Sequence, residues 1–544
     1  MAILALYDIT GIQDYIFSSS KMKENLGASI IVQKIFDEYL IKALQEYDIS
    51  NTRTLWKEYN NFLIKTDSKI KAEIIYIGGG NALVVYKDKP AFKSMNEILS
   101  NKVLEQTAGM LSIAVASIDT NFTNFHQDIM KKLIPEIKKK KYEFNQTYPL
   151  LGISITREGN TDGLPAQKKI DDEYISLSAH LKRLEAEPSY FTHRMKLNKD
   201  YQFPIYFDEL GQSKGENHIA VVHIDGNNMG KTIEKLLKDE KDYEKAVSKI
   251  RKFSKDIKTT YELIMGKVIN SIVTAMNNEK FCKQLEVNIN KNKMLLPIRP
   301  VVLNGDDVTF VCNGKIGVTC AEKFLKEIHN SSIEVDNEKI PLSACAGVAI
   351  VKSHFPFYRA YELSEQLCKS AKKKAKTLVG DKENVGNWLD YHIVFSGLTL
   401  GLDEIRANYY QVPGMNKPED LTYKKYGDVI CEAKQYNLLW RPWCIAGDTE
   451  EKYMWDKFKL IYQYFTGDDK KWPRSKLKAL RNEVIKSKVS VDLLVKELKS
   501  RGKKLPDVNG TKGNFFIDDK QTPYFDVLEL LDFYTEFPEE EEVK

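Results

Sequence analysis

The first 120 residues alternate between short apolar runs and longer segments whose apolar positions recur at helical spacing. The apolar runs predict a strand over Ile3–Asp8, a hairpin over Ala72–Tyr86 and a strand over Ser112–Ile118, with helices between them. The helix before the hairpin is expected over Ile30–Tyr47, after a polar connection at Lys21–Ser29. The order β-α-β-β-α-β is that of a ferredoxin-like, split βαβ domain.

The same order returns in the middle of the chain. An apolar strand over Ile219–Asp225 precedes helices that continue to about Asn278, and a hairpin follows around Asn304–Asp307. A helix over Thr319–Ser331 and a strand over Leu342–Val351 complete the pattern. Two ferredoxin-like units in tandem are therefore expected, by internal duplication.

Further segments extend this second unit. The apolar positions of Tyr358–Lys376 run at helical spacing, and Trp388–Val394 predicts an edge strand. Between the two units, one helix is expected over Asp172–Glu187. Beyond them, Tyr453–Leu498 is mostly helical, and the acidic end Glu539–Lys544 is expected to be disordered.

Two adjacent carboxylates, Asp306 and Asp307, lie at the tip of the second hairpin, where Asn304-Gly305 is a strong turn signal. A single Asp would fit ordinary turn chemistry. Two carboxylates between apolar strands repel each other unless a cation neutralises them. Asp225 ends the preceding apolar strand and supplies a third acid. The pattern predicts a metal site formed by these three carboxylates.

A strand that ends in Asp beside an Asp-Asp hairpin is the minimal palm of a nucleotide polymerase or cyclase, in which carboxylates hold two Mg²⁺ or Mn²⁺ ions. In the first copy, Asp8 aligns with Asp225, but Gly80 and Asn81 replace the two hairpin carboxylates. We expect this copy to be inactive. Its glycines either allow a close backbone approach or simply form a turn that needs positive φ.

The expected fold class is α+β. Two palm domains flank a connector, and a helical domain ends the chain. The predicted domains are a degenerate first palm over 1–147, a connector without a zinc ribbon over 148–215, a catalytic second palm over 216–397, and a mainly helical domain with an acidic tail over 398–544.

Composition excludes several classes of protein. The chain has 544 residues, 42% of them hydrophobic, and a net charge of +5, which is weak evidence for a polyanionic partner. The run Lys138–Lys141 is more typical of a solvated helix face. Seven cysteines without a Cys-x-x-Cys pair argue against a disulfide framework and favour the cytoplasm. The N-terminus lacks the features of a signal peptide, and no apolar run approaches membrane-spanning length, so no membrane association is expected.

Taken together, these motifs resemble the large palm-polymerase subunit of type III CRISPR effector complexes, which makes cyclic oligoadenylate messengers. They resemble diguanylate cyclase domains more distantly. The segments that carry the resemblance are Asp8–Phe17, Gly27–Ser29, Gly78–Asn81, Asp225–Gly230, Asn304–Asp307, Ser343–Gly347 and Lys369–Lys373.

The resemblance implies an enzyme of antiviral defence that joins nucleoside triphosphates, ATP first among them, into cyclic or oligomeric products. A ribose hydroxyl would attack an α-phosphate while Asp225 and one of Asp306 or Asp307 hold two ions. Lys372 would approach the phosphates, with a solvated lysine as the alternative, and Ser343 would touch a base or ribose unless it is only a strand-edge hydroxyl. The predicted nucleotide-binding residues are Gly226, Asn227, Asn228, Gly230, Asn304, Gly305, Ser343 and Lys372.

The sequence also departs from the family. It has no His-Asp dipeptide and no nuclease-sized segment before Met1, so no HD nuclease is expected. Gly163–Ala166 resembles the residues that follow the family's zinc ribbon, but the cysteines are missing, so no zinc is expected. Asn304 stands where the family has Gly. RNA, other CRISPR effector subunits or a second copy of the chain are the expected partners, and a reduced form that acts alone is equally open.

Two other functions remain open from the sequence. In the first, the palms are catalytically idle and form a scaffold for RNA or protein. The basic residues expected to contact phosphates in that case are Lys470, Lys471, Lys476, Lys478 and Arg481. The second is a GTP-using enzyme of the diguanylate cyclase type, which the duplication within one chain disfavours.

Overall fold

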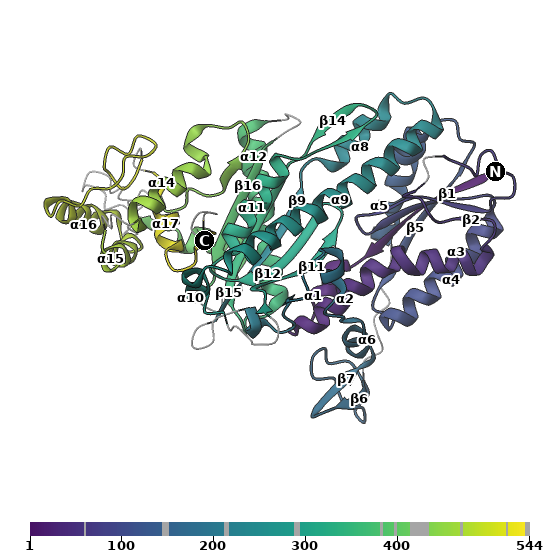
Figure 1. Ribbon diagram of the computed structural model, residues 1–544, viewed down its shortest axis with the longest axis horizontal. Coiled ribbons are helices and arrows are strands. Elements are labelled where there is room, and N and C mark those ends of the chain that lie inside the picture. Colours follow the sequence, from purple (N-terminus) through teal and green to yellow (C-terminus); the bar gives the residue numbers. More distant parts are fainter. Residues whose placement is uncertain are drawn as a thin grey trace, which may run out of the picture.

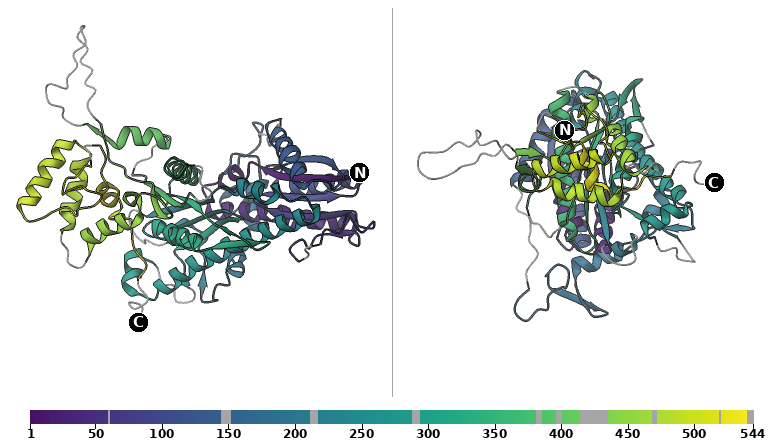
Figure 2. Two further views of the ribbon diagram at one scale, coloured as in Figure 1. Left: turned by 90° about the horizontal axis from the view of Figure 1, so that it is seen from above. Right: turned by 90° about the vertical axis from the view of Figure 1, so that its left-hand side faces the viewer.

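The computed structural model is elongated, with three parts in a row (Figures 1 and 2). One sheet lies at the N-terminal end, a second sheet lies in the middle, and helices of the C-terminal part form the opposite end. The structure describes residues 1–58, 61–143, 152–210, 217–287, 294–380, 385–395, 400–413, 435–467, 472–517 and 520–538. The predicted tail Glu539–Lys544 and the basic residues Lys470 and Lys471 lie outside these residues.

The first sheet has five strands in the order β2-β3-β4-β1-β5. Its three predicted strand regions are confirmed, since apolar β1, the β3–β4 hairpin and β5 all form. The strands are β1 Ala2–Thr10, β2 Thr52–Arg53, β3 Ala72–Gly78, β4 Asn81–Tyr86 and β5 Ser112–Thr120. The helical segments are α1 Ile12–Phe17, α2 Met22–Lys34, η1 Ile35–Leu40, α3 Ile41–Asp48, α4 Lys89–Thr107, η2 Gln127–Leu133 and α5 Ile134–Glu143.

The predicted polar connection at Lys21–Ser29 is wrong, because α2 already begins at Met22. Its polar residues are buried by a helix–helix contact rather than solvated. A Cβ on Gly27 would lie 1.6 Å from the carbonyl oxygen of Lys182 in α6 (Leu177–Glu185), so only glycine allows this approach. Glu24, 2% exposed, accepts a hydrogen bond from Arg183 Nε at 2.7 Å.

The segment between the sheets carries a projecting hairpin of β6 (Ala166–Ile170) and β7 (Glu173–Ser176) (Figure 1). The helix predicted over Asp172–Glu187 is therefore only partly correct. Its first residues pair with β6, and α6 starts after Ser176, whose hydroxyl caps it by accepting from the Ala179 N–H at 3.0 Å. The remaining elements of this segment are α7 Tyr190–Arg194, β8 Tyr201–Gln202 and η3 Phe207–Leu210.

The second sheet has six strands in the order β11-β12-β9-β15-β16-β19. Here too the predicted strands and hairpin form. The strands are β9 His218–Gly226, β11 Ile298–Asn304, β12 Asp307–Asn313, β15 Ala344–Lys352, β16 Asn387–Ile393 and β19 Trp443–Ala446. The helices are α8 Met229–Lys238, α9 Tyr243–Ala275, α10 Glu279–Leu285, α11 Gly317–His329 and α12 Phe357–Val379. Short strands lie at β10 Met294–Leu295, β13 Ser332–Val335 and β14 Glu338–Pro341.

Helices cover both faces of this sheet. On β15, a Cβ at Gly347 would lie 2.0 Å from Ser364 O of α12, whereas the next residue, Val348, packs against Gly317 of α11. Successive strand residues point to opposite faces, so α12 and α11 lie on opposite sides. The prediction of an edge strand at Trp388–Val394 is wrong. β16 is buried throughout and pairs with β19, which comes from the C-terminal part.

The two sheet-containing halves share a continuous core. Apolar residues of β3, β4 and α2 cluster with Val301 and Val302 of β11 and with Leu367 of α12. Phe17 of α1 stacks on Tyr361 of α12 with ring centroids 3.7 Å apart. Arg251 of α9, 3% exposed, reaches Glu73 of β3 at 2.8 Å. These contacts hold the halves in a defined relative position.

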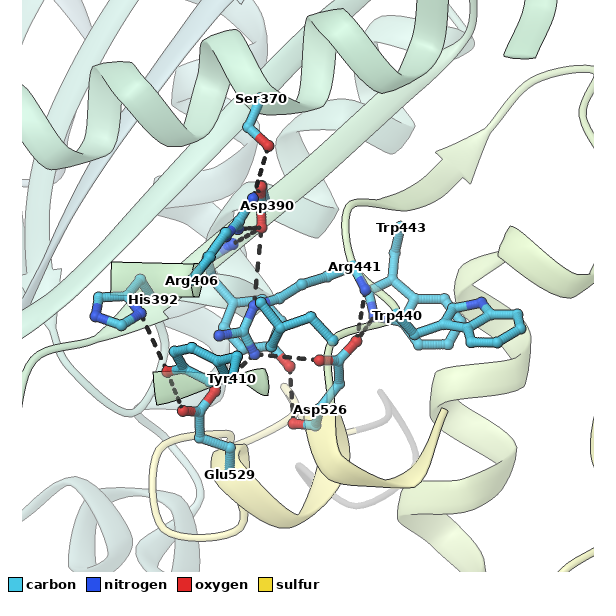
Figure 3. Close-up of polar contacts among 12 residues, drawn as sticks. Ser370, Asp390, His392, Arg406, Tyr410, Trp440, Arg441, Trp443, Asp526 and Glu529 are labelled. Carbon is cyan, nitrogen blue, oxygen red and sulfur yellow. Dashed lines mark hydrogen bonds and ion pairs between the residues drawn. The ribbon is translucent and has the colours of Figure 1, made fainter. Parts of the chain in front are cut away.

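The C-terminal part docks onto the second sheet through a buried charged network (Figure 3). Arg441 Nη1 donates to Glu529 at 2.6 Å and contacts Asp526 at 3.2 Å, and all three side chains are buried. Its elements are α13 Leu402–Tyr409, β17 Gln411–Pro413, β18 Gln435–Asn437, η5 Glu451–Tyr453, α14 Trp455–Thr466, α15 Arg474–Val484, α16 Lys488–Ser500 and α17 Tyr524–Leu530. Among the described residues, every helix is too short or too polar to cross a bilayer.

Candidate functional site

The predicted carboxylate hairpin connects β11 to β12. Asn304 pairs with Asp307, which leaves Gly305 and Asp306 as the two turn residues. Gly305 has φ 68°, a conformation that favours glycine. Asp307 in turn pairs directly with Asp225 of β9. The sheet register thus brings together carboxylates that are 82 positions apart in the chain.

The three carboxylates are divided between the two faces of the sheet. Directly opposed residues of an antiparallel pair share a face, so Asp225 and Asp307 point the same way, toward α12. Gly226 follows Asp225 and faces the other side. A Cβ on Gly226 would lie 2.8 Å from Asp306 Oδ2, which places Asp306 on that second face. The side-chain pair that can share an ion is therefore Asp225 with Asp307.

A lysine neutralises one member of this pair. Lys372 Nζ of α12 lies 2.6 Å from Asp225 Oδ2 and 2.8 Å from Gly226 O. Burial by itself lowers the pKa of Lys372, but Asp225 outweighs that effect and holds this pKa above its ordinary value. Lys372 is therefore not a solvated lysine. Its ammonium contacts Asp225 Oδ2, a carboxylate oxygen that would also be a ligand for a bound cation.

The hairpin carboxylates are poorly compensated. Burial, followed by the charge of Asp225, raises the pKa of Asp306 to about 6. The same two causes raise the pKa of Asp307 well above its usual range. Asp307 Oδ1 is buried and has no hydrogen-bond partner. The nearby His223 is neutral, because burial lowers its pKa to about 4, and its Nδ1 lies 3.2 Å from Thr309 Oγ1.

These observations fit an oxygen-ligated divalent cation. The donors are carboxylates, which Mg²⁺ and Mn²⁺ prefer, and the orphaned oxygen of Asp307 is a buried acceptor that a cation would satisfy. Among the described residues, no three His, Cys, Asp or Glu side chains are drawn close enough to form a complete ligand set. Asp225 and Asp307 would thus be completed by phosphate or water oxygens.

In the loop after Asp225, several polar groups form hydrogen bonds with other groups of the protein. The N–H of Gly226 donates to Asp306 O at 3.3 Å, and that of Asn227 donates to Ser343 O at 2.8 Å. The Asn227 amide also donates to Ser343 Oγ at 3.3 Å and to Gly386 O at 3.1 Å. Asn227 and Ser343 are 8% and 6% exposed. Both predicted nucleotide-binding residues therefore hold the loop in shape, and their role in nucleotide binding stays a prediction.

The helix that follows is placed differently. Asn228 has φ 58° and is the N-cap residue of α8, and Met229 and Gly230 form its first turn. First-turn amides of a helix lack intrahelical acceptors and favour anions. Asp306 lies on the same face of the sheet, through its contact with Gly226. Of the predicted loop residues, Gly230 is thus the one that lies within the first turn of α8.

Both halves of the protein line a cleft of about 400 Å³ at the hairpin tips. The tips meet: a Cβ on Gly305 would lie 3.5 Å from Gly79 N, and one on Gly80 would lie 3.7 Å from Asn304 Nδ2. Gly79 and Gly80 have φ 60° and 76°, so the first turn needs positive φ, and its glycines also approach the second hairpin closely. Residues of the first half that line the cleft include Asp8, Gln13, Asp14, Gln33 and Lys141.

Sequence reasoning assigned no site role to Gln13, Asp14, Gln33 and Lys141. Lys141 belonged to a lysine run interpreted as a solvated helix face, and the helical periodicity of that run carries no signal that one member turns toward a distant strand end. The other predicted residues Asn304, Asp306 and Asp307 do line the cleft.

Contacts from the C-terminal part hold the helix that carries Lys372 (Figure 3). Arg406 Nη1 donates to Ser370 Oγ at 2.9 Å, and its Nη2 donates to both oxygens of Asp390 at 2.8 Å. Lys374 Nζ donates to Trp440 O at 2.6 Å. Both contacts lie within two residues of Lys372, so the C-terminal part anchors the stretch of α12 that carries this lysine.

Comparison with known families decides the nature of the second sheet. Residues 218–379 match the family model described as Cas10/Cmr2, second palm domain. This segment is similar to the second palm domain of Cas10/Cmr2. The resemblance to CRISPR palm subunits inferred from the motifs is thereby confirmed, and the Cas10/Cmr2 match begins and ends with β9 and α12, the elements that hold Asp225 and Lys372.

Solved structures of similar fold include Csm1-Csm4 cassettes. A crystal structure of a Csm1-Csm4 cassette in complex with pppApApA matches 97% of this chain and 69% of its own, at 13% identity and a TM-score of 0.51. The cassette in complex with cA4 matches at 12% identity and a TM-score of 0.49, over 98% of this chain and 69% of its own. Curated protein sequences yield no match. At this identity, the structural likeness shows the fold.

Proposed function

We propose that the chain is a palm-domain nucleotidyltransferase that joins nucleoside triphosphates, with ATP as the first candidate, into a cyclic or oligomeric messenger of antiviral defence. The observation that carries the proposal is the same-face pair of Asp225 and Asp307 beside a cleft lined by both halves of the protein. The Cas10/Cmr2 match and the nucleotide complexes of the similar Csm1-Csm4 structures support it.

The proposed organisation is a tandem of two ferredoxin-like palms. In both sheets, the strand that follows the closing helix lies beside the first strand: β5-β1-β4-β3 in one and β15-β9-β12-β11 in the other. We propose a degenerate palm over 1–147, a connector over 148–215, the catalytic palm over 216–397 and a helical domain over 398–544. Of these, 59–60, 144–151, 211–216, 288–293, 381–384, 396–399 and several later segments lie outside the described residues.

In this proposal, Asp225 and Asp307 hold two Mg²⁺ or Mn²⁺ ions. The ions, when bound, lower the pKa of the attacking ribose hydroxyl and neutralise the departing pyrophosphate. Lys372 would compensate Asp225 and the incoming polyphosphate together, on the face of the sheet that holds the pair of Asp225 and Asp307. Asn304 lines the cleft, and Gly305 lies against Gly79 of the first hairpin, so this hairpin tip limits the acceptor's size.

A catalytically idle scaffold for RNA or protein is the second candidate. The specific observation in its favour is the Lys372–Asp225 pair, which already neutralises one of the two carboxylates that the enzyme would need for metal binding. In that case, nucleic-acid binding should depend steeply on salt and be insensitive to the Asp residues.

The test is to incubate the full chain with each NTP and Mg²⁺ or Mn²⁺, with and without RNA, and to identify products by mass spectrometry. We expect a product from the wild type and its loss in Asp225→Asn and Asp307→Asn, since phosphoryl transfer depends on the positioned ions. Asp336→Asn is a matched control, because Asp336 is a 59% exposed carboxylate in the β13–β14 turn. Absence of product with any NTP would favour the scaffold.

A further inference from the structure

The first half keeps part of the charge arrangement of the catalytic site. Lys141 Nζ lies 2.6 Å from Asp8 Oδ2, and Lys372 Nζ lies 2.6 Å from Asp225 Oδ2. Asp8 pairs with Asn81 across the first hairpin's sheet, in the way that Asp225 pairs with Asp307. The hairpin carboxylates have been lost, but a strand-end carboxylate with a lysine on it remains.

The two lysines come from corresponding elements. Lys141 is in α5, the helix that follows the closing strand β5, and Lys372 is in α12, the helix that follows the closing strand β15. An arrangement repeated at this level of topology indicates that the lysine belongs to the duplicated site rather than to an incidental surface pair. The pair is therefore expected to keep a role in ligand binding.

Its place in the cleft gives that role a chemical basis. The described residues that line the cleft include four carboxylates, those of Asp8, Asp14, Asp306 and Asp307, but only one cation, that of Lys141. A polyphosphate is a polyanion and is repelled by such a wall unless positive charge is supplied. An ammonium on a flexible four-carbon stem is a suitable point charge for phosphate.

We propose that Lys141 is a phosphate-binding residue of this cleft. In the nucleotide-free protein, Asp8 holds the Lys141 ammonium at the cleft wall. When a nucleoside triphosphate enters, the ammonium turns to its phosphate oxygens and Asp8 becomes solvated. The side chains of Lys141 and Asp8 are 39% and 23% exposed, so this exchange needs no opening of the core. The inference rests on the proposed function, in that the cleft receives a nucleoside triphosphate.

The pair is also suited to substitution. A partly exposed ion pair contributes at most about 1 kcal/mol to stability, so variants at either residue should fold. Lys139 provides a matched control, because it lies on the same helix, is 64% exposed and pairs with Glu143 at 3.7 Å. Any loss of binding specific to Lys141 then reflects its place in the cleft.

The experiment is calorimetric titration of the full chain, in Mg²⁺, with ATP and with α,β-methylene-ATP, which cannot react at the α-phosphate. Lys141→Met should weaken triphosphate binding by about 10-fold or more, since a hydrogen bond to a charged group is lost. Lys141→Arg should retain most of it, and Lys139→Met should match the wild type. Asp8→Asn should tighten binding, because it frees the ammonium and removes a negative charge.

Substitutions at Lys141 and Asp8 are expected to change nucleotide affinity in opposite directions, which distinguishes a role in binding from a purely structural role. If Lys141→Met binds both nucleotides as the wild type does, the inference fails while the proposed function stands. If Asp8→Asn and Lys141→Met weaken binding equally, the pair only shapes the wall, which also overturns the inference. If the wild type itself binds neither nucleotide, the proposed function fails and this inference fails with it.

Discussion

At the scale of single residues, the environment of Asp307 separates it from its neighbour Asp306. Both carboxylates lie in the turn, but only Asp307 shares a face with Asp225 and has an oxygen without a partner. A partly buried carboxylate beside another carboxylate destabilises the protein when both are charged. This cost arises at one position of the second hairpin, whereas in the first sheet the residue that pairs with Asp8 is Asn81.

This predicts that Asp307→Asn stabilises the metal-free protein. The folded pKa of Asp307 lies above its unfolded value, so its charged form near pH 7 is disfavoured in the folded state, and this penalty disappears in the neutral amide. We expect a gain of about 1 kcal/mol, a modest value because the side chain is 37% exposed and screened by solvent. Urea unfolding at pH 7 in EDTA measures it.

Magnesium provides the second half of that experiment. A ligand that binds only the folded state raises its stability, so Mg²⁺ should raise the urea midpoint of the wild type. It should leave Asp307→Asn nearly unchanged, whereas the exposed control Asp336→Asn should respond as the wild type does. A destabilised Asp307→Asn in EDTA would contradict the view of this carboxylate as an uncompensated ligand.

At the scale of elements, glycines set the distances between helices and their neighbours. Gly27 allows α2 to meet α6, and Gly347 allows β15 to meet α12. The first contact converts an apparently polar connection into a buried helix, and the second brings the helix of Lys372 against the sheet. Helical periodicity alone does not show either contact, because a glycine carries no side chain to contribute to the pattern.

Gly27→Ala should therefore destabilise the protein by about 2–3 kcal/mol, since a side chain placed 1.6 Å from a backbone carbonyl forces α2 and α6 apart. Thermal or urea unfolding measures the loss. Gly266→Ala in α9 is the matched control. A Cβ at this position would meet no atom within 4 Å other than the backbone of its own helix, and alanine should stabilise that helix by about 1 kcal/mol. Equal stability of the two variants would rule out a tight α2–α6 contact.

At the scale of the whole molecule, the C-terminal part completes the palm rather than following it. β19 extends the second sheet, and Arg406 and Trp440 hold α12 on either side of Lys372. The junction is charged and buried, with Arg441 and Asp526 both fully inaccessible. Removing one partner of such a pair leaves an unpaired buried charge.

Arg441→Met should consequently cost about 3–5 kcal/mol, because Asp526 and Glu529 lose their shared cation. Limited proteolysis should then release the C-terminal part at protease levels that leave the wild type intact, and urea unfolding should show the same loss. Arg474→Met, at a 63% exposed arginine paired with Asp532, should cost about 1 kcal/mol or less. Similar losses in both variants would show that the buried network does not anchor this part.

The sequence by itself predicted the main strands of both sheets, the hairpins β3–β4 and β11–β12, and the three candidate carboxylates. Apolar periodicity and turn chemistry are local signals, and the strands Ile3–Asp8 and Ile219–Asp225 could be predicted from them. The repeated order of elements likewise needed no tertiary information. It also singled out Lys372, because the motif that contains it resembled a known family.

Only the tertiary structure decided how those residues divide. The sheet register places Asp225 opposite Asp307 on one face, whereas Asp306 lies on the other face. Asn227 and Ser343 form a hydrogen bond with each other. Packing brought Lys141 from a lysine run to Asp8, a strand end 133 positions earlier. Such contacts depend on which faces of distant elements meet, and the free energy of burying those faces is a property of the assembled molecule, which no local pattern records.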